Sequence, residues 1–224
     1  MSSADTEAAD VEDVPDEPAV DDAREALLAR VRTGLGDAVV GSHILAGHAL
    51  WVRVTRDAWT EAATFARHDL GFDFFDFLSA IDWLPSPFGR DMEAEQDWVV
   101  HGRETKETPA QETGHAGGDT RFQLLGRVQK AGDPLGLILK ADLPDDDLRA
   151  PTWIPEYPGA DWHEREAWEM FGIHFDGHPG LRHIYLPGEF EGNPLRKDYP
   201  LLARRVKPWP GIVDVELMPG DEGP

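Results

Sequence analysis

The sequence predicts an α+β protein of two layers, in which helices pack on a mixed or antiparallel sheet. Three observations lead to this prediction. Residues Leu50–Val54 alternate between an aliphatic and a mixed face, as a half-buried strand does. Two more alternating runs, Arg121–Gln129 and Leu135–Leu143, are joined by a short turn sequence that is typical of a β-hairpin. Residues 23–36 and 57–68 repeat apolar side chains at helical spacing.

The charge of the chain argues against a nucleic-acid partner. The 224 residues carry a formal net charge of -22. Nine of the 43 acidic residues lie within the first 22 positions, where Lys and Arg do not occur. The rest of the chain still has 34 acidic against 21 basic residues. Such a surface repels phosphate backbones, so we expect no nucleic acid to bind.

Cysteine is absent from the sequence. This excludes disulfides, thiolate nucleophiles and cysteine-ligated iron–sulfur clusters within this chain. The N-terminus lacks the apolar core of a secretory signal, and no run of about 18 apolar residues could span a bilayer. We therefore expect a cytoplasmic chain that reaches a membrane only through a partner.

The chain begins with an expected disordered acidic tail over residues 1–22, because dense like charge with few aromatic residues cannot bury enough apolar surface to fold. An α+β core domain is predicted to follow over residues 23–158. Its first helix starts at Ala23 with an aspartate as N-cap, and Gly34 or Gly36 ends it.

Two segments of the core domain are less regular. Phe72–Trp83 is rich in phenylalanine, and we expect a core strand or a helix–strand corner with solvent-exposed aspartates in preference to a ligand pocket. From residue 85 to residue 119 the periodicity disappears, apart from an apolar fragment at 98–100. So long a stretch without periodicity indicates a loop insertion.

Residues 159–201 form the most conspicuous segment, which we expect to be a signature helix followed by an interface segment. Asp161 followed by Glu164 resembles a capping box, which predicts a helix that begins at Trp162. Gly172 is expected to end this helix.

The side chains on this predicted helix indicate two different surroundings. Arg165 and Glu169 are four residues apart and can pair on a helix. The helix also carries more large apolar side chains than one narrow stripe can hold, so we expect one side to be buried within this chain and another by a partner.

The residues after the helix are expected to continue without helical structure. Asn193–Pro200 contains two prolines, which predicts an extended, stiff segment. Residues 202–224 are expected to form an extended C-terminal arm, in which an alternating run at 213–217 could add a strand to a neighbour.

The histidines leave a metal-dependent hydrolase open as an alternative from a different functional class. Such an enzyme would use His174, His178 and His183 as ligands. The neighbouring HExxH pattern is incomplete, because it begins at His163 but Ala167 stands where the second histidine is needed. A simple acidic binding module is a third alternative.

The segment closely resembles the signature of the C subunit of respiratory complex I, the NuoC-type or thirty-kilodalton subunit family of proton-pumping NADH:quinone oxidoreductase. The residues that carry the resemblance are Glu164-Arg165-Glu166, Glu169 to Gly172, His178-Pro179, Leu181-Arg182, Ile184, and Gly192 through Pro200. Their order and spacing agree over about forty residues. The resemblance extends more weakly over roughly Leu50 to Leu201.

The resemblance implies a subunit of an enzyme complex that passes electrons from NADH through FMN and iron–sulfur clusters to quinone and pumps protons. It implies that this chain holds no cofactor, since FMN and the clusters belong to partner subunits, and that it has no catalytic or metal-binding residues. Its implied work is to clamp subunits D, B and I of the peripheral arm, with the G subunit as a further candidate, at the cytoplasmic side of the cell membrane. A homologous subunit of a membrane-bound nickel–iron hydrogenase is the alternative within the same class.

The expected interface consists of the signature positions. These are Glu164, Arg165, Glu166, Trp168, Glu169, Phe171, Gly172, His178, Arg182, Pro194, Leu195, Arg196, Lys197 and Asp198.

Overall fold

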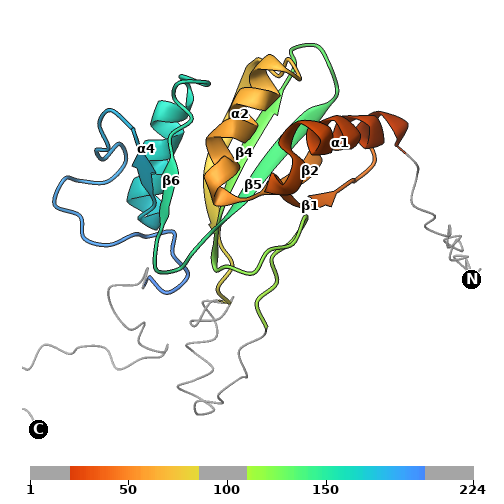
Figure 1. Cartoon of the computed structure of the whole chain (residues 1–224). Coiled ribbons are helices and arrows are strands. Elements are labelled where there is room, and N and C mark those ends of the chain that lie inside the picture. The colour runs from red at the N-terminus through yellow and green to blue at the C-terminus, as the bar shows by residue number, and fades with distance from the viewer. Residues whose placement is uncertain (1–20, 86–109, 200–224) are drawn as a thin grey trace, which may run out of the picture.

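The computed structural model describes residues 21–85 and 110–199 (Figure 1). Almost all of the expected acidic tail (1–22), most of the 85–119 insertion and the whole C-terminal arm (202–224) lie outside the described residues. The predictions made for these segments therefore remain predictions.

The described residues form a mixed sheet of five strands in the order β1-β2-β5-β4-β3. The strands are β1 (Val39–His43), β2 (Leu50–Val54), β3 (Phe74–Asp82), β4 (Phe122–Gln129) and β5 (Gly136–Leu143). Strand β2 runs parallel to β5, and the other neighbours are antiparallel. The α+β class, the strand at 50–54 and the β4–β5 hairpin are confirmed.

Two helices, α1 (Asp22–Leu35) and α2 (Trp59–His68), lie on the same face of the sheet (Figure 1). Short 3-10 turns, η1 (Gly36–Ala38) and η2 (Arg56–Ala58), connect them to the strands. The side chain of Asp21 accepts a hydrogen bond from the backbone N–H of Arg24, so it caps α1 as predicted. Gly36 ends the helix.

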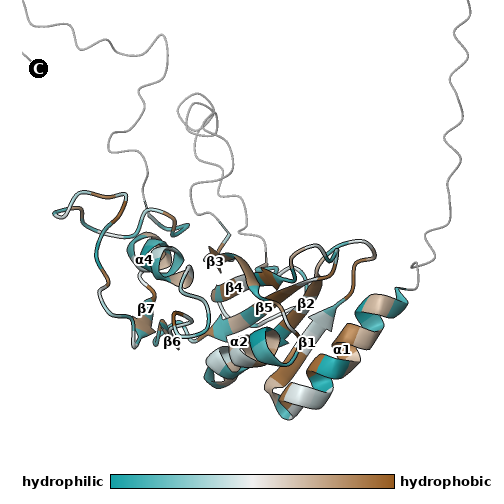
Figure 2. Cartoon of the chain, turned by 90° about the horizontal axis from the view of Figure 1, so that it is seen from above, coloured by the Kyte–Doolittle hydropathy of each residue, from teal (hydrophilic) through white to brown (hydrophobic). Residues whose placement is uncertain are grey.

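A third helix, α4 (Ala160–Phe171), packs beside β3 (Figure 1). The short parallel strands β6 (Arg149–Pro151) and β7 (His174–Asp176) precede and follow it. Figure 2 shows apolar residues concentrated on the central strands, whereas α4 is mostly polar. No helix among the described residues is both long and apolar enough to cross a bilayer.

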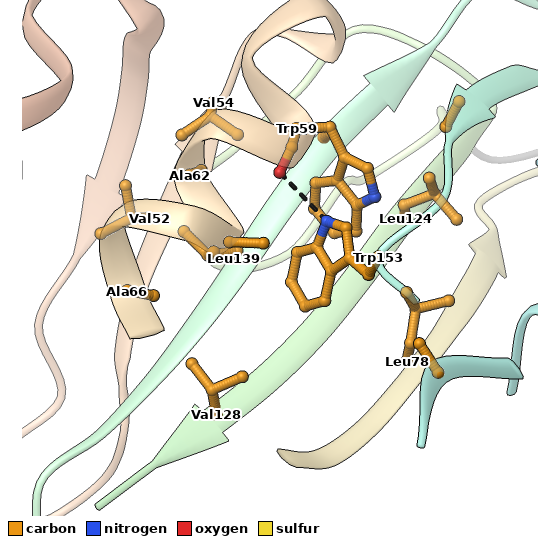
Figure 3. Packing of buried hydrophobic residues seen from close by; sticks show 14 of the residues in the cluster. Val52, Val54, Trp59, Ala62, Ala66, Leu78, Leu124, Val128, Leu139 and Trp153 are labelled. Atoms are coloured by element: carbon orange, nitrogen blue, oxygen red, sulfur yellow. Dashed lines mark hydrogen bonds between the residues drawn. The ribbon is translucent and has the colours of Figure 1, made fainter. Parts of the chain in front are cut away.

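The core joins the sheet to α2 and to the segment that leads into α4. The indole rings of Trp59 and Trp153 stack with 4.3 Å between centroids, and Trp153 Nε1 donates a hydrogen bond to the Trp59 carbonyl at 3.0 Å (Figure 3). Trp153 lies against Gly126 of β4, where any β-carbon would collide with the indole. Both tryptophans are fully buried. The region around α4 is therefore fixed to the sheet by a continuous core.

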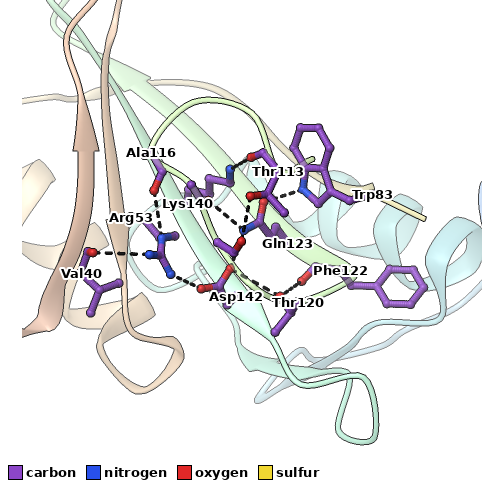
Figure 4. Close-up of polar contacts among 12 residues, drawn as sticks. Val40, Arg53, Trp83, Thr113, Ala116, Thr120, Phe122, Gln123, Lys140 and Asp142 are labelled. Carbon is purple, nitrogen blue, oxygen red and sulfur yellow. Dashed lines mark hydrogen bonds and ion pairs between the residues drawn. The ribbon is translucent and has the colours of Figure 1, made fainter. Parts of the chain in front are cut away.

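The opposite face of the sheet is partly covered by residues 110–120. Fully buried Lys140 of β5 donates hydrogen bonds from Nζ to the carbonyls of Thr113 and His115 at 2.5 and 2.9 Å (Figure 4). Arg53 pairs with Asp142 on the same face. Burial lowers the pKa of Lys140 to about 8. The Lys140 contacts hold the end of the insertion against the sheet.

Candidate functional site

The signature helix differs at its start from the sequence-based expectation. It begins at Ala160, two residues early, and its N-cap is Gly159, which offers no side-chain hydrogen bond. The predicted capping box is wrong, because Asp161 lies inside the first turn and its carboxylate approaches His178 Nε2 at 3.0 Å. The predicted end is confirmed, since Gly172 adopts a left-handed conformation with φ of 76°.

Glu164 lies on the inner side of α4 and is completely buried. One carboxylate oxygen accepts a hydrogen bond from the Thr152 hydroxyl and the other from the Trp153 backbone N–H, both at 2.6 Å. Burial raises the pKa of Glu164 to about 7, although both hydrogen bonds favour the charged form. Glu164 thus binds α4 to the segment at Thr152 and Trp153 that precedes it.

Arg165 and Glu169 do not pair with each other in the described part of the chain, so the i,i+4 ion pair that their spacing allows does not form. Arg165 donates instead to the carbonyls of Arg182 and His183 at 3.1 and 3.3 Å. Both side chains are buried beneath the chain that returns across the helix, which helical spacing alone could not indicate.

The carboxylate of Glu169 accepts hydrogen bonds from the returning chain. Its donors are the backbone N–H groups of Ile184 and Tyr185 at 3.0 and 2.9 Å. The His183 ring lies 3.0 Å away. Burial alone would raise the pKa of Glu169, but these hydrogen bonds outweigh it and hold that pKa below its usual range. The 182–185 segment is therefore bound to α4 by this buried carboxylate and by Arg165.

The segment after residue 192 is not extended as predicted. It forms two consecutive turns, closed by hydrogen bonds from the Arg196 N–H to the Asn193 carbonyl and from the Tyr199 N–H to the Arg196 carbonyl. In this conformation the segment donates hydrogen bonds to the last carbonyls of α4. Arg196 Nε donates to the Phe171 carbonyl at 2.7 Å, and the Leu195 N–H donates to the Met170 carbonyl at 3.1 Å.

The same segment is held to the sheet by Asp82 at the end of β3. Phe72–Trp83 is a strand over most of its length, but the expectation of a solvent-exposed aspartate is wrong at Asp82, whose side chain is fully buried. Arg121 pairs with both Asp82 and Asp198, and the Lys197 N–H donates to Asp82 at 2.8 Å. Burial alone would raise the pKa of Asp82, but Arg121 and the backbone donors lower it.

The remaining signature residues divide between the core and the surface. Phe171 is buried, and Trp168 packs against the His183 ring with 5.1 Å between centroids. Glu166 and Pro194 are half-buried, whereas Arg182, Leu195, Lys197 and Asp198 are exposed. Their assignment to an interface with another protein remains a prediction.

The histidines named for a metal-dependent hydrolase are engaged separately. The His178 ring accepts from the Gly180 N–H at 3.0 Å, and His183 contacts Glu169. His174 is exposed on β7. Among residues 21–85 and 110–199, no three His, Cys, Asp or Glu side chains are grouped so that they could hold a metal ion.

Two contributors to the site were missed by the sequence analysis. His163 Nδ1 lies 3.3 Å from the backbone nitrogen and 3.1 Å from the carbonyl oxygen of Leu78, so its ring covers the free edge of β3. The alternating pattern places Arg121 in a hairpin strand but gives no sign of its ion pairs with Asp82 and Asp198. No local signal marks either role, because each partner lies far away along the chain.

Around α4, buried charged side chains therefore join separate segments of this chain. A family model described as "Respiratory-chain NADH dehydrogenase, 30 Kd subunit" matches residues 52–205. The chain belongs to this family, which confirms the resemblance to the NuoC-type subunit of complex I.

Relatives include the C/D subunit of NADH-quinone oxidoreductase from Klebsiella pneumoniae subsp. pneumoniae, which is 53% identical over 73 residues. That match covers 33% of this chain and 12% of the relative. The C/D subunit from Photorhabdus laumondii subsp. laumondii is 40% identical over 110 residues, which are 49% of this chain and 18% of the relative. The match thus spans less than a fifth of the length of these relatives.

The chain is also similar to two solved structures. One belongs to the membrane-bound sulfane sulfur reductase, an archaeal respiratory membrane complex, with a TM-score of 0.58 and 17% identity over 80% of this chain and 86% of that chain. The other is a trypsin-resistant fragment of Nqo5, with a TM-score of 0.47 and 21% identity over 70% of this chain and 98% of the fragment.

Proposed function

We propose that this chain is a non-catalytic scaffold subunit in the peripheral arm of a complex I. The complex transfers electrons from NADH through FMN and iron–sulfur clusters to quinone and couples this transfer to proton translocation. The observation that carries the proposal is the family match over residues 52–205. The buried carboxylates around α4 support it, because Glu164, Glu169 and Asp82 hold segments of this chain in place and are not directed at a shared reaction centre.

The first partner of this scaffold is the D subunit. The relatives in Klebsiella and Photorhabdus combine C and D in the name of one protein, which supports a direct contact between the two subunits. Subunits B and I, with G as a further candidate, complete the proposed neighbourhood. Attachment to the cytoplasmic side of the membrane is then indirect and peripheral.

Native electrophoresis of solubilised membranes tests this function. We expect an antibody against the chain to detect it in the band that oxidises NADH in the gel. The complex purified from that band should contain FMN and transfer electrons to quinone. A chain found in a nickel-containing complex without flavin would instead identify the hydrogenase alternative. Metal analysis of the purified chain tests the hydrolase, for which a stoichiometric metal ion would be required.

A further inference from the structure

The outer side of α4 exposes large apolar side chains that have no covering element among the described residues. Trp162 is 63% exposed, Tyr185 is 66% exposed and Leu195 is 49% exposed. They come from the helix, the 182–185 segment and the turns after residue 192. Large exposed apolar groups that gather around one element mark protein contact sites more often than isolated ones do.

Helical geometry places Glu166 in the same row of α4 as the exposed Trp162. Trp162, Glu166 and Met170 follow each other at intervals of four and span about 12 Å of the helix. The Leu195 N–H donates to the Met170 carbonyl, so Leu195 stands at the end of the row. Met170 itself is half-buried and packs against the core. We therefore call Trp162, Glu166 and Leu195 the outer stripe. Tyr185 flanks it, because its N–H is bound by Glu169 of the same helix.

The charged side chain of the outer stripe, Glu166, differs from the charged side chains of the neighbouring rows in its hydrogen-bond partners. Glu164, Arg165 and Glu169 are all satisfied within the chain. The carboxylate of Glu166 makes no hydrogen bond or ion pair with any other described residue. The Trp162 ring is nevertheless positioned, since the guanidinium of buried Arg165 lies 5.5 Å from its centroid. A positioned aromatic ring loses little conformational entropy when a partner covers it.

We propose that the outer stripe, with Tyr185 beside it, is the docking surface for a partner polypeptide that offers an apolar recess with a Lys or Arg opposite Glu166. The basic residue is needed because a carboxylate covered without a countercharge is strongly unfavourable. The excess of acidic residues in the chain favours such a partner. This inference rests on the proposed function, under which the D subunit is the partner, and it assigns the contact to residues other than the buried signature charges.

A competition for incorporation tests the surface. The full-length chain is produced in its own cells in two differently tagged forms, wild type and variant, and their ratio is measured in the purified complex. We expect Trp162→Ser combined with Tyr185→Ser, and separately Glu166→Lys, to enter the complex at least about tenfold less than the wild type. Equal incorporation of both variants would overturn the docking surface. Absence of the wild-type chain itself from the complex would instead overturn the proposed function.

Matched controls come from the far side of the fold. Val40 is 45% exposed on β1, the sheet edge opposite β3, and Glu61 is exposed on α2. Val40→Ser and Glu61→Lys should incorporate as well as the wild type. Equal losses in these controls would show that any surface change impairs assembly, which also overturns the assignment.

A benzophenone amino acid placed at position 162 gives a second readout that does not depend on stability. Irradiation of the intact complex should join it to another subunit, and the same probe at position 40 should give no such product. Cross-linking from position 162 only to this chain, whether to residues 200–224 or to a second copy, would contradict the proposal.

Discussion

Glu164 provides the sharpest prediction about how the fold is stabilised. Its carboxylate is fully buried and binds Thr152 and Trp153. Substitution Glu164→Gln keeps nearly the same shape. The Gln amide oxygen can still accept from the Trp153 N–H, and the amide nitrogen can donate to the Thr152 hydroxyl. The variant therefore removes the ionisation and retains the packing.

The magnitude follows from the pKa of Glu164, which burial raises from 4.5 to about 7 in the folded chain. Between these pH values the folded chain holds a proton that the unfolded chain has released. The free energy of unfolding therefore falls as the pH rises from 4.5 to about 7, and this contribution levels off above that range. At about 1.4 kcal/mol per pKa unit, the loss is about 3 kcal/mol.

Urea denaturation of the purified chain between about pH 4.5 and about pH 8.5 measures this effect. The difference in the free energy of unfolding between Glu164→Gln and the wild type should change by about 3 kcal/mol in favour of the variant as the pH rises. Glu166→Gln is the matched control, because Glu166 is only half-buried on the same helix, and its difference should stay nearly constant. Parallel pH profiles for Glu164→Gln and the wild type would refute the reasoning.

Three further predictions concern the segments that enclose α4. Arg121→Ala leaves the fully buried carboxylate of Asp82 without its cation and should lower the free energy of unfolding by about 3–5 kcal/mol. Arg149→Ala breaks an exposed ion pair and should lower it by less than about 1 kcal/mol, and urea denaturation of both variants compares the two losses. Gly172→Ala should shift the urea midpoint further than Gly36→Ala, since both glycines have positive φ but only a β-carbon at Gly172 meets neighbouring side chains. Arg196→Ala removes the hydrogen bond at the end of α4 and should loosen assembly; full subunit stoichiometry and NADH:quinone activity in the purified variant complex would contradict this.

Expectations based on local patterns agree well with the structure. The strand at Leu50–Val54, the β4–β5 hairpin and the end of α4 at Gly172 follow from alternation, turn residues and the left-handed preference of glycine. Each of these signals is contained within a few neighbouring residues. The family signature is likewise a property of the sequence alone.

Errors arose where a charged side chain had a partner far along the chain. The pairing of Arg165 with Glu169 was judged from helical spacing alone, but each side chain binds a segment 14 to 18 residues away. Asp82 was expected in solvent and instead meets Arg121, which lies 39 residues further on. Sequence spacing cannot reveal such contacts, because they form only after distant segments have packed together.

The sequence by itself determined the α+β class, the β4–β5 hairpin, the end of α4 at Gly172 and the family, since periodicity and motif spacing are local properties of the chain. Only the tertiary structure decided which signature charges are enclosed and which side of α4 remains uncovered. The physical reason is desolvation: a carboxylate can be buried only where donors converge on it, and these donors come from chain segments that the fold alone brings together.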